Sequence, residues 1–198
     1  MLATLGRWTL LLLSVGVTGY GLFAYFGLEP GSTVHPTMKA TYAAHPWRIL
    51  PHVACSAVAL LVGPLQFFPA LRARRRLHRA IGYAYFIAVL GGGISGLATA
   101  FVAYGGLASK LGFGLLALLW LWTTVAAVRA ARARDFAAHE AWAIRSFALT
   151  FAAVTLRIYL GSFFAAGLDF DAFYPVLAWL SWVPNLIFVE WVLLARRR

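Results

Sequence analysis

Two histidines, His78 and His139, are the residues of this sequence best suited to bind a haem iron or a transition metal. Imidazole nitrogens are ligands of haem iron, copper and zinc. Each of the two follows an arginine-rich segment and opens an apolar one, so they would form a ligand pair if both segments are helices of one bundle. The alternative for each is a solvated or hydrogen-bonded residue at a helix end. A third histidine, His52, opens another apolar stretch, where only His35 and His45 could join it.

Two arginines, Arg145 and Arg157, lie inside one apolar stretch, where a charge costs at least ~2.5–3.5 kcal/mol if the stretch spans a membrane. Arg145 could pair with Glu190, which lies at a comparable depth in the last apolar stretch, or it could bind a ligand. At ~1.5 Å per residue, Arg157 lies about 18 Å further along the same helix. Its candidate partners are Asp169, Asp171, Asn185 or a bound anion, whose carboxylate or phosphate its guanidinium could hold in bidentate fashion.

The elements that carry these residues are predicted to be membrane-spanning helices. Of the 198 residues 62% are hydrophobic and 12% are charged, whereas soluble domains average about 45–50% and about 25%. Six stretches approach or exceed the ~20 apolar residues that a spanning helix needs, at about 8–28, 47–68, 81–104, 111–128, 141–166 and 176–194. The first apolar run is too long for a signal peptide. We therefore expect an all-α, polytopic helical bundle that forms a single transmembrane domain over residues 1–198, with a four-helix core of the second to fifth helices.

Polar residues and glycines recur at helical spacing on three of these predicted helices, which places them on one face of each. On the fifth helix these are His139, Ser146, Thr150 and Arg157, with Trp142 and Arg145 beside them. On the second they are His52, Ser56, Gly63 and Gln66, and on the third they are His78, Gly82 and Gly96, with Gly92 close by. The glycines favour close helix packing, and a flat cofactor edge would need the same clearance.

The distribution of basic residues predicts the orientation. If the six helices alternate, 12 of the 17 Lys and Arg fall on one side, namely Arg7, Arg72, Arg74, Arg75, Arg76, Arg79, Arg129, Arg132, Arg134, Arg196, Arg197 and Arg198. Only Lys39, Arg48 and Lys110 fall on the other. The positive-inside rule then places both termini in the cytoplasm. The net charge of +11 is thus a topology signal, not evidence for nucleic-acid binding, and lipid phosphate is the expected contact. The single cysteine, Cys55, excludes a disulfide framework.

Several segments together resemble a known family. They are Gly63-Pro64-Leu65-Gln66-Phe67, then Leu77-His78-Arg79 with Gly82 and Tyr85, then His139 with Trp142 and the run Arg145-Ser146-Phe147-Ala148-Leu149-Thr150, and finally Thr155-Leu156-Arg157. This pattern resembles a bacterial family of predicted membrane proteins known only as a domain of unknown function, over about residues 51–160. The resemblance implies that His52, Gln66, His78, His139, Arg145 and Arg157 are the positions that match the family, and it implies no activity. In architecture alone the chain is also similar to transmembrane cytochromes b, which use more histidines, placed deeper in their helices.

Three functions follow from these residues as hypotheses. The first is a membrane electron-transfer protein in which His78 and His139 bind haem b or a metal and the arginines bind propionates or a quinone. The second is a small transporter or binding protein for an anionic or lipidic solute, lined by Arg157, Gln66, His52 and Thr150. The third is a non-catalytic scaffold in which polar faces lock the bundle. No HExxH, GxSxG or phosphate-binding glycine loop occurs, so hydrolase or nucleotide chemistry has no support, and the sequence leaves open whether the protein is an enzyme.

Overall fold

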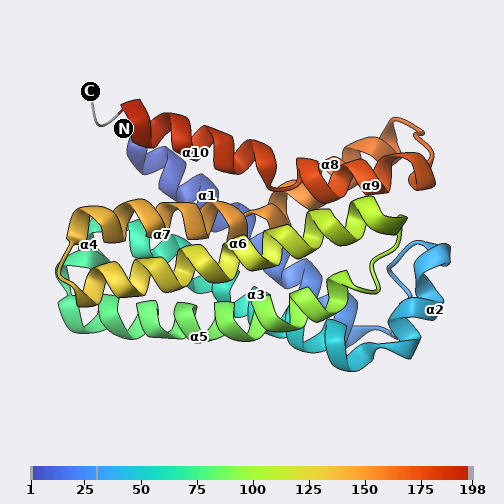
Figure 1. The fold of residues 1–198 in the computed structure, drawn as a ribbon, viewed down its shortest axis with the longest axis horizontal. Coiled ribbons are helices and arrows are strands. Elements are labelled where there is room, and N and C mark those ends of the chain that lie inside the picture. The colour runs from blue at the N-terminus through green and yellow to red at the C-terminus, as the bar shows by residue number, and fades with distance from the viewer. Residues whose placement is uncertain (1, 30, 196–198) are drawn as a thin grey trace. The chain divides into compact units, whose positions relative to one another are not determined.

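The computed structural model describes residues 2–29 and 31–195, and every regular element among them is helical (Figure 1). Arg196, Arg197 and Arg198, which contribute to the predicted orientation, lie outside the described residues. The chain forms two compact units, residues 1–95 and residues 96–198, and each is considered by itself.

The first unit begins with α1 (Leu2–Leu22), which continues as a π-helical turn η1 (Phe23–Gly27). A short helix α2 (Pro36–Ala44) leads into α3 (Pro46–Val62), which ends in a 3₁₀ turn η2 (Pro64–Phe67). After α4 (Pro69–Ala73) the chain enters α5 (Arg75–Ala100), which runs past the boundary between the units. The segment between the first two predicted spans therefore contains a helix, α2. Its first residue is a proline, which suits the first turn of a helix because no N–H is needed there.

The second unit contains α6 (Gly106–Arg132), α7 (Phe136–Thr150), α8 (Ala152–Ala165), α9 (Phe170–Leu180) and α10 (Val183–Ala195). Asp135 caps the start of α7 by accepting from the backbone N–H of Ala138 at 3.0 Å, and Asp169 caps α9 by accepting from that of Ala172 at 3.2 Å. Both caps show how aspartates just outside an apolar stretch set where the helix begins.

Six helical segments in the described part of the chain are long and apolar enough to cross a membrane, which confirms the predicted fold class. They run over residues 4–27, 46–67, 75–100, 106–132, 136–165 and 170–195. The third to sixth spans each begin five or six residues earlier than predicted, at residues 75, 106, 136 and 170, and the fourth extends to Arg132 instead of 128. An apolar stretch ends where arginines begin, but arginine is a good helix former. The helical backbone hydrogen bonding therefore continues through the charged turns. The four-helix core stays a prediction, because its helices belong to both units.

The last two spans are interrupted, which the sequence analysis did not predict. Phe151, between α7 and α8, has ψ of −11°, away from the helical value of about −42°. Between α9 and α10 the chain turns at Ser181 and Trp182, just before Pro184. Proline lacks the N–H that would continue the ladder and is tolerated in a first helical turn, so Pro184 ends one helix and starts the next.

Candidate functional site

The polar face of α7 packs against α6. Three interhelical hydrogen bonds join the two helices at successive levels. They are His139 Nδ1 to Ala127 O at 2.9 Å, Thr124 Oγ1 with Ser146 Oγ at 2.6 Å, and Trp120 Nε1 to Thr150 Oγ1 at 2.8 Å. Three of the four residues predicted to share one face of the fifth span, His139, Ser146 and Thr150, thus bond to one neighbour. This part of the polar face joins helices, as the scaffold hypothesis expects.

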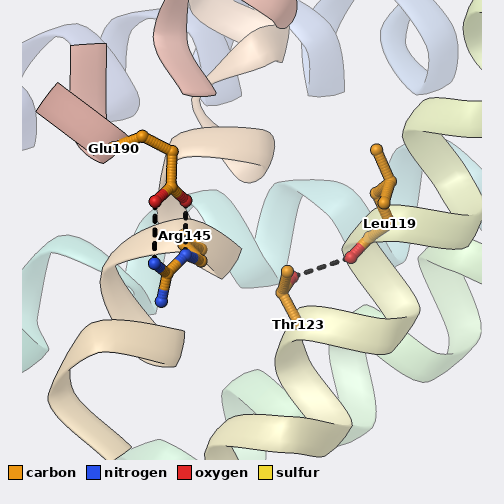
Figure 2. A network of polar contacts seen from close by, with 4 residues as sticks. All are labelled: Leu119, Thr123, Arg145 and Glu190. Atoms are coloured by element: carbon orange, nitrogen blue, oxygen red, sulfur yellow. Dashed lines mark hydrogen bonds and ion pairs between the residues drawn. The ribbon is translucent and has the colours of Figure 1, made fainter. Parts of the chain in front are cut away.

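Arg145, beside that face, forms an ion pair with Glu190 of α10, as one of the two predictions for it stated. Its Nε donates to Glu190 Oε1 at 2.5 Å and its Nη2 donates to Oε2 at 2.8 Å, so the pair is bidentate (Figure 2). The guanidinium carbon also lies 4.7 Å from the ring centroid of Trp142. The side chain of Arg145 is 15% exposed and that of Glu190 is 40% exposed, so the pair is partly shielded from its surroundings.

A pocket of about 470 Å³ surrounds this ion pair. Three helices line it, with Leu119, Trp122 and Thr123 from α6, with Ala138, Ala141, Trp142 and Arg145 from α7, and with Leu186 and Glu190 from α10. Thr123 donates its hydroxyl to Leu119 O at 2.8 Å, so this polar group is satisfied within its own helix (Figure 2). The remaining wall is aliphatic or aromatic, and Trp122, which is 67% exposed, forms part of the rim.

Arg157 lies on α8 and takes no part in this pocket. Its Nη1 donates to Ala153 O, one turn earlier, at 2.9 Å. Of its predicted partners, Asp169 caps α9, and Asp171 accepts from the hydroxyl of Tyr104 at 2.7 Å. Arg145 and Arg157 therefore occupy different surroundings, although they belong to one span.

Asn185, named from the sequence only as a partner for Arg157, connects the two interrupted spans. Its Nδ2 lies 3.3 Å from Ala148 O, 3.1 Å from Thr155 Oγ1 and 3.2 Å from Ser181 O. Thr155 Oγ1 in turn donates to Ser181 O. The interruptions of the fifth and sixth spans are thus joined by side chains that bond to backbone carbonyls near both turns, which is how broken helices satisfy their backbone in a membrane.

In the first unit, His52 and Gln66 bond to α5. His52 Nδ1 lies 2.7 Å from Gly92 O, and Gln66 Nε2 donates to His78 O at 3.2 Å. A Cβ added at Gly91 would lie 2.7 Å from Cys55 Sγ, so the glycine face of α5 packs closely against α3. His78 is the fourth residue of α5, just as His139 is the fourth of α7.

The two histidines bonded to carbonyls share one protonation pattern. A carbonyl oxygen only accepts, so Nδ1 of His52 and of His139 carries the proton, and in the neutral ring the lone pair belongs to Nε2. Metal-binding histidines commonly donate their other nitrogen to a backbone carbonyl in this way. Among residues 2–29 and 31–195, however, no group of three or more His, Cys, Asp or Glu is arranged to hold a metal ion. A metal shared by His78 and His139 stays a prediction.

Most of the pocket wall was not predicted from the sequence. Trp142, Arg145 and Glu190 stood out there, but the other lining residues did not, namely Leu119, Trp122, Thr123, Ala138, Ala141 and Leu186. Part of the signal was present, because Ala138, Ala141, Trp142 and Arg145 follow the spacing of a single helical face. Apolar residues at this spacing are the rule in a spanning helix, so nothing in the sequence marks them as a wall.

The fold and these polar contacts define a multi-pass helical membrane protein. More specifically, the chain belongs to the family described as Predicted membrane protein (DUF2306), whose model matches residues 49–193. This confirms the resemblance seen in the sequence and extends it beyond residue 160, so that the matched region includes the whole pocket and Glu190. The comparisons with curated proteins and with solved structures gave no significant match.

Proposed function

We propose that this protein binds a small lipid-soluble molecule in the pocket around Arg145, as a membrane carrier or binding protein. The observation that supports this most is the pocket itself, whose volume of about 470 Å³ falls within the ~300–1,000 Å³ typical of ligand sites. It combines aliphatic and aromatic walls with one group of polar atoms, which is the usual composition of a small-molecule site. One wall of the pocket is formed by the fifth span, which contains Arg145. Inserting an arginine into a membrane is costly, so intramembrane arginines often have a function such as ligand binding.

The polar atoms of the pocket favour a ligand with hydrogen-bond acceptors. Arg145 has five N–H donors, and Glu190 takes one from Nε and one from Nη2. Within the described part of the chain, the contacts of Arg145 are those with Glu190 and the ring of Trp142. Donors on Nη1 and the second donor on Nη2 are therefore available to a ligand.

The test fills the pocket without removing a polar group. Ala141→Leu adds three carbons to the pocket wall, whereas Ala137→Leu, the control, adds the same bulk at an exposed position of α7 outside it. Each variant is purified in mild detergent, and its bound small molecules are extracted and identified by mass spectrometry. We expect a molecule that co-purifies with the wild type and the control but not with Ala141→Leu. If all three proteins carry the same extract, or none carries any, the pocket is not a ligand site.

A second candidate function is electron transfer with haem b or a metal, and the histidines support it. His139 and His52 both bond through Nδ1 to a backbone carbonyl, which is the arrangement that metal-binding histidines commonly have. Haem or a transition metal at these histidines or at His78 would supply one-electron chemistry within the bilayer. An absorption spectrum with metal analysis of the purified protein tests this, because a colourless, metal-free protein contradicts it. If both tests fail, the polar contacts act only as a scaffold.

We further propose that the chain lies in the inner membrane of a bacterium with both termini in the cytoplasm. The exposed arginines of α4, of the start of α5 and of the end of α6 support this, because all of them would lie on one side of the membrane if the six spans alternate in direction. Reporter fusions test it. An alkaline phosphatase domain is inactive in the cytoplasm, so it should be inactive when fused to the C-terminus and active when inserted after Gly31. The opposite pattern would reverse the orientation.

A further inference from the structure

We infer that the ligand of the pocket is an uncharged planar molecule with ring carbonyls, of the quinone class, and not an anion. This inference rests on the proposed function and specifies its substrate class. It starts from the charge of the site, since Arg145 and Glu190 are the two charged residues in the pocket wall and they neutralise each other. An anion entering a site of zero net charge would lose its hydration without gaining a counter-charge.

The remaining donors of Arg145 match a carbonyl oxygen. Glu190 binds the side of the guanidinium formed by Nε and Nη2, which leaves the edge formed by Nη1 and the outer N–H of Nη2. Figure 2 shows the third nitrogen of the guanidinium directed away from the Glu190 carboxylate. Two N–H groups on one rigid edge can both donate to a single carbonyl oxygen, which has two lone pairs. Glu190 holds the guanidinium in position, so its orientation is fixed before a ligand binds.

The apolar part of the wall fits a flat ring. Ala138 and Ala141 are three residues apart on α7, and their methyl groups leave a shallow surface beside Arg145. Trp142 and Trp122 contribute aromatic side chains to the wall from two helices, and the guanidinium of Arg145 lies over the ring of Trp142. Offset stacking of aromatic rings contributes ~0.5–1.5 kcal/mol beyond the area that it buries, so these walls favour a conjugated ring over a flexible acyl chain.

The experiment compares two small probes, one uncharged and one anionic, with the full-length protein in nanodiscs. Ubiquinone-1 is an uncharged ring with two carbonyls, and decanoate is an anion without a ring. Binding is measured by calorimetry against empty nanodiscs, which corrects for partition into lipid. We expect the wild type to bind ubiquinone-1 at least about tenfold more tightly than decanoate, a ratio that corresponds to about 1.4 kcal/mol. The reason is that the carboxylate of decanoate loses more hydration than a neutral carbonyl does and gains no counter-charge in the pocket.

Glu190→Gln changes the charge of the pocket and keeps its size. With the carboxylate neutralised, Arg145 gives the pocket a net positive charge. Decanoate should then bind about tenfold more tightly than it binds to the wild type, and the affinity for ubiquinone-1 should change less. Arg145→Met should lower the affinity for ubiquinone-1 by about tenfold. Arg157→Gln, which lies outside the pocket, should change the affinity for neither probe.

The outcomes separate this inference from the proposed function. If the wild type binds decanoate as tightly as ubiquinone-1 or more tightly, the site takes anions, and the quinone assignment is wrong although the pocket binds ligands. If ubiquinone-1 binds equally well to the wild type and to Ala141→Leu, it binds elsewhere, and the assignment to this pocket fails. If neither probe binds the wild type, the quinone assignment fails, and the molecule that co-purifies with the wild type decides the proposed function. The comparison of the two probes on the wild type needs no variant, so it holds even if Glu190→Gln does not fold.

Discussion

Replacing Glu190 by methionine should destabilise the protein, and replacing Arg145 as well should restore part of the loss. In Glu190→Met the guanidinium of Arg145 loses its counter-charge, and arginine cannot lose its proton to escape the cost. The double variant, Arg145→Met with Glu190→Met, removes both charges and places two flexible apolar side chains in a partly apolar site.

The structure sets the size of the effect. Breaking a fully buried ion pair by removing one partner costs about 3–5 kcal/mol, whereas an exposed pair contributes about 0–1 kcal/mol. The side chains of Arg145 and Glu190 are 15% and 40% exposed, so the pair lies between these limits. We expect Glu190→Met to lower the free energy of unfolding by about 2 kcal/mol. The double variant loses the contact of Arg145 with Trp142, worth about 0.5–1 kcal/mol, so it should be more stable than Glu190→Met by about 1 kcal/mol.

Reversible unfolding in mixed micelles with increasing sodium dodecyl sulfate, followed by tryptophan fluorescence, measures these differences. Arg157→Met is a matched control, because Arg157 lies on the same span but outside the pocket. A double variant that is less stable than Glu190→Met would refute the reasoning, since the two residues would then contribute independently. A change below about 0.5 kcal/mol for Glu190→Met would show that the pair is solvated like a surface pair.

Three further predictions concern helix packing. Asn185→Leu should lower stability by about 1 kcal/mol in the same assay, because the bond to Ala148 O is lost where two spans are interrupted, and unchanged unfolding would contradict a joining role. Gly91→Ala should lower stability by about 1–3 kcal/mol, because the added Cβ would lie 2.7 Å from Cys55 Sγ. Adding Cys55→Ala to that variant should recover most of the lost stability, and no recovery would show that the clash lies elsewhere. Thr124→Val should cost about 0.6 kcal/mol, the average for an interhelical bond in a membrane, and a gain in stability would argue against the bond.

The number of spans could be predicted from the sequence, and the pairing of Arg145 with Glu190 was one of the two alternatives that the sequence offered for that arginine. The length and hydropathy of a segment can be read directly from the sequence. They predict a helix because, inside a bilayer, every backbone group of a spanning segment must be hydrogen-bonded within that segment. Comparable depth in two spans and the cost of leaving either charge alone favoured the ion pair, but they did not exclude a ligand as the partner of Arg145. Helix ends were predicted less well, because arginines at the ends lower hydropathy without ending the helix.

The polar face of the fifth span shows what helical periodicity can predict and what it cannot. Helical spacing correctly grouped His139, Ser146 and Thr150, because 100° per residue is fixed by backbone geometry. It could not tell which neighbour that face meets, so it did not distinguish a ligand-binding face from one that packs on α6. Arg157 shared the spacing, yet its Nη1 bonds to a carbonyl of its own helix beyond the turn at Phe151.

The sequence by itself determined that this chain is a six-span membrane protein, which family it belongs to and which charges lie within its spans. Only the tertiary structure decided that Arg145 and Glu190 meet at the wall of a pocket, and that Asn185 joins two interrupted spans. The reason is that rotation and register between helices depend on the packing of many side chains at once, whereas hydropathy and depth are set by each segment alone.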